Sequence, residues 1–202
     1  MMDRELHTPI DESDARSLNA GETVYVTGRL FTARDDAHRV MLEAAARGEE
    51  MPLRPSEMVL FHCGPVIAKE GDGWRVVAAG PTTSARMEMF EADFLDRFET
   101  RLIIGKGGMG TRTLEALERV GAVYTHFTGG AGALAARAVR AVPAVYWLDE
   151  LGIPEAVWVF EAERFGPLTV TMDAHGKSLY DELSLVVEKN LEAIHARIEE
   201  GE

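Results

Sequence analysis

The amino-acid sequence predicts a layered α/β fold with a mixed β-sheet and a long C-terminal helix. Short β-rich segments dominate the first half of the chain, whereas strand and helix patterns alternate in the second half. A long amphipathic pattern over residues 179–198 ends the chain. Because no internal repeat and no interdomain linker interrupts these patterns, we expect residues 21–202 to form one domain after an N-terminal arm, residues 1–20.

The first elements follow from strand alternation and helical spacing. Residues 23–28 alternate and are rich in β-branched side chains, so they predict a strand. Apolar residues from Ala37 to Ala45 recur at i, i+3, i+4, i+7 and i+8, which predicts a helix with Gly48 just beyond its end. Two prolines within residues 49–56 favour a loop.

The middle of the chain predicts a pair of strands and the start of a helix. Two apolar runs, 58–63 and 74–79, are typical of strands, and residues 69–73 between them are typical of a turn. A helix is expected to start within residues 80–84, where hydroxyl side chains are candidate N-caps. Arg86 would then lie inside the first turn of that helix.

Strands and helices alternate from residue 101 onward. The expected order is a strand at 101–104, a glycine-rich loop at 105–110, a helix at 111–120 that ends at Gly121, a strand at 122–127 and a helix that opens at 129–132. Three further apolar runs precede the last helix, at 142–148, 156–160 and 168–172.

The net charge excludes two classes of partner. The chain has 202 residues, with 34 Asp+Glu against 21 Lys+Arg and a formal net charge of −13. We therefore expect no nucleic acid and no anionic membrane surface as a partner, because both require a basic face. Nine of the thirteen net negative charges lie in residues 1–22 and 181–202, so the central domain still has room for a locally positive site.

Cysteine content and hydropathy favour a cytoplasmic chain. The one cysteine, Cys63, allows no intrachain disulfide, and its apolar neighbours indicate a buried thiol. No run of 18 apolar residues predicts a transmembrane helix, and the acidic N-terminus lacks the apolar stretch of a signal peptide.

Three junctions at the ends of predicted strands each carry a cation. Arg34 lies in the first junction, Arg86 follows Thr82 and Thr83 in the second, and Lys106 lies in the glycine-rich loop. Ligands of open α/β sheets gather at strand ends, so three cations there would suit a small dicarboxylate. The alternative at each junction is ordinary helix capping with a surface cation.

The glycine-rich loop also fits a weaker hypothesis. Residues 105–110 match the G-x-G-x-x-G pattern of dinucleotide-binding folds. That fold needs an acidic residue about 20 positions further on to hold the ribose, and residues 123–130 contain none. A nicotinamide-dependent enzyme is therefore the weakest of the hypotheses considered.

Four sequence blocks together resemble a known family. They are Phe31–Asp35 with His38, Ala79–Met87, Ile104–Gly107 and Gly129–Ala131. In this order they resemble the β subunit of the iron–sulfur class I fumarate hydratases and L(+)-tartrate dehydratases, a unit that forms the C-terminal domain of single-chain members. The resemblance extends over roughly residues 20–185 and implies a swivelling β/β/α domain of a hydro-lyase.

The resemblance also implies roles for individual residues. Arg34, Arg86 and Lys106 correspond to the cations that bind the substrate carboxylates, and Thr82 corresponds to the suggested base. Asp35 and His38, which are i, i+3 neighbours, correspond to supports for Arg34. Supporting positions are also expected at Thr83, Gly129 and Gly130, and no metal site is expected on this chain.

A companion subunit is implied as well. In the family, three cysteines of the α subunit hold a [4Fe–4S] cluster, and a chain with only Cys63 cannot hold one. We therefore expect a cysteine-containing α subunit, a hetero-oligomer (or a homodimer when the chain is alone), and fumarate, malate or tartrate as substrate. Fumarate hydration is the first hypothesis and tartrate dehydration the second, while a non-catalytic anion-binding or assembly module remains the alternative from another class.

Overall fold

The sheet is organised around strand β2, which has neighbours along both of its edges. The computed structural model describes residues 4–199, apart from the side chains of residues 192, 193, 196, 197 and 199. Its strands are β1 (Arg4–His7), β2 (Thr23–Thr32), β3 (Val59–Phe61), β4 (Val66–Glu70), β5 (Gly73–Ala78), β6 (Leu102–Gly105), β7 (Val123–His126), β8 (Val139–Tyr146) and β9 (Val157–Met172). Its helices are α1 (Glu12–Arg16), α2 (Asp35–Ala46), α3 (Glu88–Phe98), α4 (Thr111–Val120), α5 (Gly132–Ala138), α6 (Leu148–Leu151) and α7 (Leu179–Glu199), with 3₁₀ turns η1 (Pro55–Glu57) and η2 (Ser84–Arg86).

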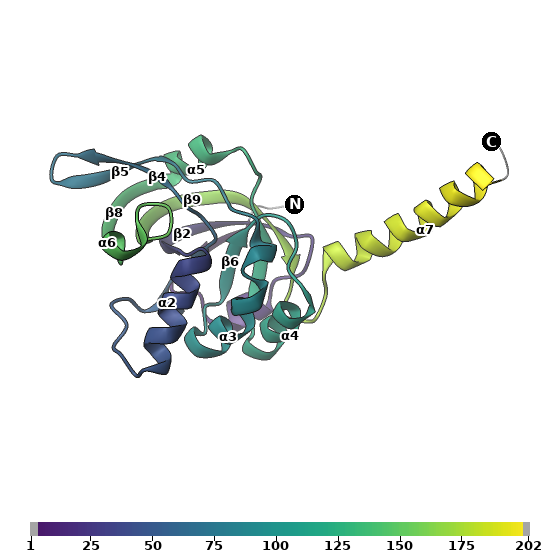
Figure 1. Cartoon of the computed structure of the whole chain (residues 1–202), viewed down its shortest axis with the longest axis horizontal. Coiled ribbons are helices and arrows are strands. Elements are labelled where there is room, and N and C mark those ends of the chain that lie inside the picture. Colours follow the sequence, from purple (N-terminus) through teal and green to yellow (C-terminus); the bar gives the residue numbers. More distant parts are fainter. Residues whose placement is uncertain (1–3, 200–202) are drawn as a thin grey trace.

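Strand β9 closes the sheet into a ring. Strands β2, β3, β6 and β7 are parallel neighbours in that order, and β9 runs antiparallel to both β7 and β2. Phe31 of β2 thus lies opposite Leu60 of β3 on one side and Val159 of β9 on the other. The predicted layered α/β fold with a mixed sheet and a long C-terminal helix is confirmed (Figure 1).

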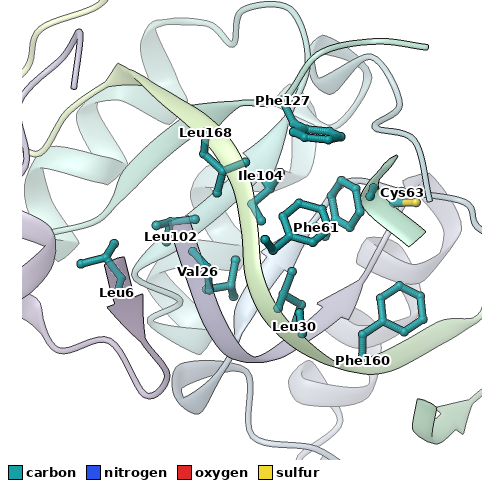
Figure 2. Close-up of a cluster of buried hydrophobic side chains, with 14 of the residues drawn as sticks. Leu6, Val26, Leu30, Phe61, Cys63, Leu102, Ile104, Phe127, Phe160 and Leu168 are labelled. Carbon is teal, nitrogen blue, oxygen red and sulfur yellow. The ribbon is translucent and has the colours of Figure 1, made fainter. Parts of the chain in front are cut away.

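The two faces of the strands bury two separate apolar clusters. Side chains alternate along a strand, so neighbours in sequence point to opposite faces. In β6, Ile104 joins the cluster with Val26, Leu30 and Phe61 that Figure 2 shows, whereas Ile103 joins the cluster under the helices. Every strand of the ring is thus fixed on both faces, which holds its carboxyl end in place.

Helices α2, α3 and α4 cover the outer face of these strands (Figure 1). Their apolar faces supply Met41, Phe94, Leu95 and Leu117 to the second cluster. The predicted ends of two helices are confirmed, because Gly48 and Gly121 adopt φ of +73° and +69°, a left-handed conformation that favours glycine.

Several expectations for local structure are wrong. Residues 66–70 form β4, which pairs with β5 in a hairpin, where the sequence indicated only a turn between two strands. The apolar runs 156–160 and 168–172 belong to one strand, β9, because the polar residues between them still pair with neighbouring strands. Arg86 lies in η2 rather than inside a helix, and Thr83 makes no side-chain cap hydrogen bond.

The two ends of the chain are placed differently. Residues 4–7 of the expected N-terminal arm form β1, parallel to β2, and residues 1–3 lie outside the described part of the chain. Helix α7 extends away from the rest of the molecule (Figure 1). None of the described helices is long and apolar enough to cross a membrane.

Candidate functional site

The candidate site lies at the carboxyl edge of the parallel strands. Arg34 follows β2, Lys106 follows β6, and Gly129 and Gly130 follow β7 after two intervening residues or more. Because β2, β3, β6 and β7 run parallel, their carboxyl ends meet at one edge of the sheet. The fold thus brings the predicted junctions together.

Backbone contacts join the threonine segment to this edge. The Thr82 amide donates a hydrogen bond to the carbonyl oxygen of His62 over 2.7 Å. Thr83 forms a parallel bridge with Lys106, and the Ser84 amide donates to the Lys106 carbonyl oxygen over 3.0 Å. A Cβ added at Gly129 would lie 3.6 Å from Lys106 Cδ. Thr82, Thr83, Lys106 and Gly129 therefore form one continuous surface.

Gly64, which is half-buried, and Glu155, which is distant in the sequence, hold Arg34 in place. Arg34 Nε lies 3.2 Å from Oε1 of Glu155, and only 21% of the Arg34 side chain is exposed. A Cβ at Gly64 would stand 2.6 Å from Arg34 Nη1, so this guanidinium packs directly over a backbone without a side chain. Burial raises the pKa of Glu155, although the charge of Arg34 opposes the shift.

Asp35 orients Arg86, contrary to the expectation that it supports Arg34. Arg86 Nη2 lies 2.7 Å from Asp35 Oδ2, and Arg86 Nε donates to Asp35 Oδ1 over 3.2 Å. A guanidinium has five N–H donors, so donors remain for a ligand after the contacts with Asp35. About half of the Arg86 side chain is exposed, which leaves it accessible.

Lys106 differs from the two arginines. Among the side chains that the structure describes, no carboxylate lies within 4.0 Å of Lys106 Nζ. Arg34 and Arg86 are thus each held by an acidic partner, whereas Lys106 has none among the side chains that the structure describes. Such an edge attracts an anion with two charged ends.

A hydrogen-bonded network of buried polar side chains lies directly behind this edge. Glu91 of α3 is fully buried, and its Oε2 lies 2.9 Å from His62 Nε2 and 3.5 Å from His38 Nε2. His38 Nδ1 donates to the Arg34 carbonyl oxygen over 2.8 Å, and His62 Nδ1 lies 2.9 Å from Ser84 Oγ. His38 therefore supports the Arg34 segment through the backbone.

The network continues to the loop that carries Lys106. The Tyr124 hydroxyl lies 2.9 Å from Ser84 Oγ and donates to the carbonyl oxygen of Gly107 over 2.8 Å. Glu91, His62, Ser84 and Tyr124 thereby connect α3, the end of β3, η2 and the loop after β6. All three cation-bearing junctions therefore contact the same buried group of polar side chains.

The two imidazoles favour the carboxylate form of Glu91. Burial by itself raises the pKa of Glu91, but His62 and His38 outweigh it and lower that pKa to about 2. Burial lowers the pKa of His62, against the opposing effect of Glu91. Glu91 is thus a carboxylate that depends on its two imidazole neighbours, because an uncompensated buried charge is very unfavourable.

The donor atoms of His38, His62 and Glu91 lie within 4.8 Å of one another, and two imidazoles with one carboxylate are ligands that zinc and iron accept. Glu91 Oε2 lies 2.9 Å from His62 Nε2, so these two candidate ligands already contact each other without an ion between them. The absence of a metal from this chain stays a prediction.

The cysteine content does not fit an iron–sulfur cluster. Cys63 is the single cysteine and is buried, and burial strongly raises the pKa of its thiol. A cluster needs several thiolates at its irons. The residues of this chain therefore do not fit a [4Fe–4S] cluster.

The candidate site is open rather than enclosed. Three cavities of about 510, 300 and 300 Å³ lie elsewhere, and none is lined by Arg34, Thr82, Arg86 or Lys106. A small dicarboxylate bound at this edge would be shielded from water only after another surface covers it.

Sequence reasoning missed the network behind the edge. The sequence patterns predict no role for His62, Glu91 or Tyr124, and they indicate Ser84 only as a candidate N-cap. A usable signal existed, because Glu91 interrupts the apolar stripe of α3 formed by Met87, Phe94, Leu95 and Phe98. A carboxylate inside an apolar stripe requires a buried partner.

Comparison with known proteins gives consistent results. The family model described as "Fumarase C-terminus" matches residues 2–183. The chain is 42% identical over 182 residues to the "Putative L(+)-tartrate dehydratase subunit beta" of Methanocaldococcus jannaschii, which covers 90% of this chain and 93% of the relative.

Two further relatives show the same pattern. The "L(+)-tartrate dehydratase subunit beta" of Escherichia coli strain K12 is 40% identical over 181 residues, or 90% of this chain and 88% of the relative. The "Putative fumarate hydratase class I" of Geobacillus stearothermophilus is 40% identical over 179 residues, which are 88% of this chain and 34% of that longer protein.

Replacing Glu91 by Gln tests the buried charge. We expect Glu91→Gln to lower the free energy of unfolding at pH 7 by about 3 kcal/mol, because two imidazoles lose their carboxylate. The pKa of Glu91 is lower in the folded chain than its usual 4.5, so its contribution is present above that pH and is lost as pH falls toward 2. As pH falls from 4.5 toward 2, the free energy of unfolding from urea titrations should therefore decrease less for the variant than for the natural chain.

The exposed Glu115→Gln is the matched control and should leave the unfolding free energy and its pH dependence unchanged. Elemental analysis of the purified chain provides a second check. The interpretation is that His62 and His38 alone stabilise the Glu91 carboxylate. One zinc or iron per chain would contradict it, as would a Glu91→Gln variant with the same unfolding free energy as the natural chain at pH 7.

Replacing Gly105 by Ala tests the link between η2 and the Lys106 loop. A Cβ at Gly105 would clash with Ser84 Oγ and stand 2.7 Å from the Tyr124 hydroxyl oxygen. We expect a loss of about 1–3 kcal/mol in urea unfolding, because both side chains must move. Gly73→Ala should be nearly neutral, since its closest atom lies 3.8 Å away.

Proposed function

The chain belongs to the fumarase C-terminus family, and on this basis we propose that it is the β subunit of a two-subunit iron–sulfur hydro-lyase that hydrates fumarate reversibly to malate. Its relatives are named as subunits beta of tartrate dehydratase and as a fumarate hydratase, which places the chain in a hydro-lyase family. The finer assignment of substrate, cluster and companion subunit is our proposal.

One observation carries the proposal: the segments that carry Arg34, Arg86 and Lys106 lie at the same sheet edge as the Thr82 segment. Fumarate and malate have a carboxylate at each end, so two separated cationic groups are the minimum that fixes both ends. Arg86 offers further N–H donors beyond its contacts with Asp35, and the Lys106 segment bridges to Thr83. Arg34 supplies a third, more buried cation.

The chain's own residues would hold the substrate and handle one proton. Arg34, Arg86 and Lys106 bind the two carboxylates and thereby orient the carbon skeleton over Thr82. The Thr82 backbone, which carries the hydroxyl, is positioned by the hydrogen bond that its amide donates to the His62 carbonyl oxygen. A threonine hydroxyl is a weak base, so a neighbouring group from a companion subunit must accept its proton for it to remove one from carbon.

The cluster belongs to the companion in this proposal. Cys63 is buried with a raised pKa and is the chain's one cysteine, so the cluster ligands must lie on another chain. We therefore expect a cysteine-containing α subunit and a hetero-oligomer. In such an enzyme this chain would supply the cationic side of the substrate site, and the α subunit would supply the other side.

Dehydration of L(+)-tartrate is the second candidate, and one observation favours it. The relatives that this chain covers almost completely, at 93% and 88% of their length, are named as tartrate dehydratase subunits. The fumarate hydratase relative is covered only over 34% of its length. Assays of fumarate, malate and L(+)-tartrate side by side, with the reconstituted two-subunit enzyme, distinguish the two reactions.

Truncation of Arg86 tests the assigned role. In the reconstituted enzyme, Arg86→Ala should lower kcat/KM by about 10- to 100-fold, because charged hydrogen bonds to a carboxylate are lost. Arg112→Ala, which removes a similarly exposed arginine from α4, should leave kcat/KM unchanged. An Arg86→Ala enzyme with unaltered kcat/KM would exclude this residue from carboxylate binding.

Calorimetry addresses the non-catalytic alternative. The isolated chain should bind malate only weakly, since its edge is open to water. Tight malate binding without a companion would instead support a self-sufficient anion-binding module.

A further inference from the structure

Helix α7 carries an apolar face that stays exposed in the part of the chain that the structure describes. Its 21 residues span about 31 Å and extend away from the sheet (Figure 1). Six apolar residues on one side of the helix are between 51% and 65% exposed: Leu183, Val186, Val187, Leu191, Ile194 and Ile198. Their spacing follows the period of an α-helix, and soluble proteins seldom expose such a stripe without a binding partner.

The helix begins beside the candidate site. The hydroxyl of Tyr180, in the first turn of α7, lies 2.8 Å from His126 Nδ1 at the end of β7. A Cβ at Gly108 would stand 2.9 Å from Tyr180 Cγ, so the Tyr180 ring packs on the loop that carries Lys106. A partner bound along α7 would therefore adjoin the open edge formed by Thr82 and Lys106.

We propose that the apolar face of α7 docks into an apolar groove, flanked by basic side chains, on the companion subunit that completes the site. This inference rests on the proposed function, because it assumes that such a subunit exists. It assigns to α7 the task of holding the two chains together where the substrate binds.

The comparisons give one reason to expect a separate companion to need an interface of its own. The family match ends at residue 183, so most of α7 lies beyond the shared domain. In the fumarate hydratase relative, the matching region is 34% of one continuous protein, and the remainder is joined to it by the chain itself. A covalent link supplies a high effective concentration, which a separate subunit must replace with an interface.

Charge argues against a second copy of this chain. Residues 181–202 contain seven acidic and two basic residues, a net charge of −5. Glu182 borders the apolar face, and Asp181 and Glu188 lie further round the helix, so acidic side chains predominate on the rest of the α7 surface. Two such helices would repel each other, whereas a groove with a basic rim would attract α7.

The test uses the full chain and the purified companion subunit. Three exposed side chains are changed together, Leu183→Gln, Val187→Gln and Leu191→Gln, and Leu185→Gln is the matched control on the opposite side of the helix. We expect the triple variant to bind the companion about 100-fold more weakly in calorimetry, with the control unchanged. Circular dichroism and thermal melting should match for all three proteins, since these side chains are exposed.

Light scattering of the chain alone distinguishes docking to a companion subunit from docking to a second copy of this chain. A monomer whose binding to the companion weakens with added salt is the expected result. Self-association that the triple variant abolishes, or wild-type affinity of the triple variant for the companion, would overturn the proposal.

Activity assays keep this inference distinct from the proposed function. At saturating companion, the triple variant should regain the kcat of the natural enzyme, because α7 holds the subunits and does not touch substrate. A complex that requires α7 for assembly, yet converts none of fumarate, malate and tartrate, would refute the proposed function alone. An active complex that is indifferent to the triple variant would refute the docking of α7 alone.

Discussion

The contact between Glu91 and His62 is the constraint on which the geometry of the edge depends. A carboxylate with no exposure must be compensated at close range, so His62 and His38 cannot move away without leaving a buried charge alone. His38 fixes the start of α2, and His62 fixes the end of β3 and, through Ser84, the η2 turn. Apolar packing would tolerate small displacements of these segments, whereas a buried charge with directional neighbours restricts them much more strongly.

Much of the fold could be predicted from the sequence, since local patterns there agree with the final packing. The helix at 111–120 ends at Gly121 as expected, because a left-handed residue and an amphipathic spacing are both local signals. Strand β9 could not be recognised as one element. Its polar middle residues look like a loop until their pairing with β2 and β8 is known, and such pairing is a property of the assembled sheet.

The positions of the site's cations could be predicted from the sequence, but the partners of these cations could not. Cations next to strand ends can be read from the sequence, and parallel strands then bring Arg34 and Lys106 to a common edge. Their acidic partners cannot be read in this way. Glu155 lies far from Arg34 in the chain, and Asp35 pairs with Arg86 rather than with its own neighbour. These pairings depend on side-chain direction in three dimensions, and the roles assigned to the cations and to Thr82 stay predictions.

The closure of the ring by β9 has a consequence for how the chain acquires its structure during synthesis. Residues 157–172 must return to pair with residues 23–31, so the outer edge of β2 stays unpaired until most of the chain has left the ribosome. Contacts between such distant segments form late, because the entropy of closing a long loop must be overcome first. Until that moment the nascent chain exposes an apolar strand edge, a state in which it is most open to chaperones and to aggregation.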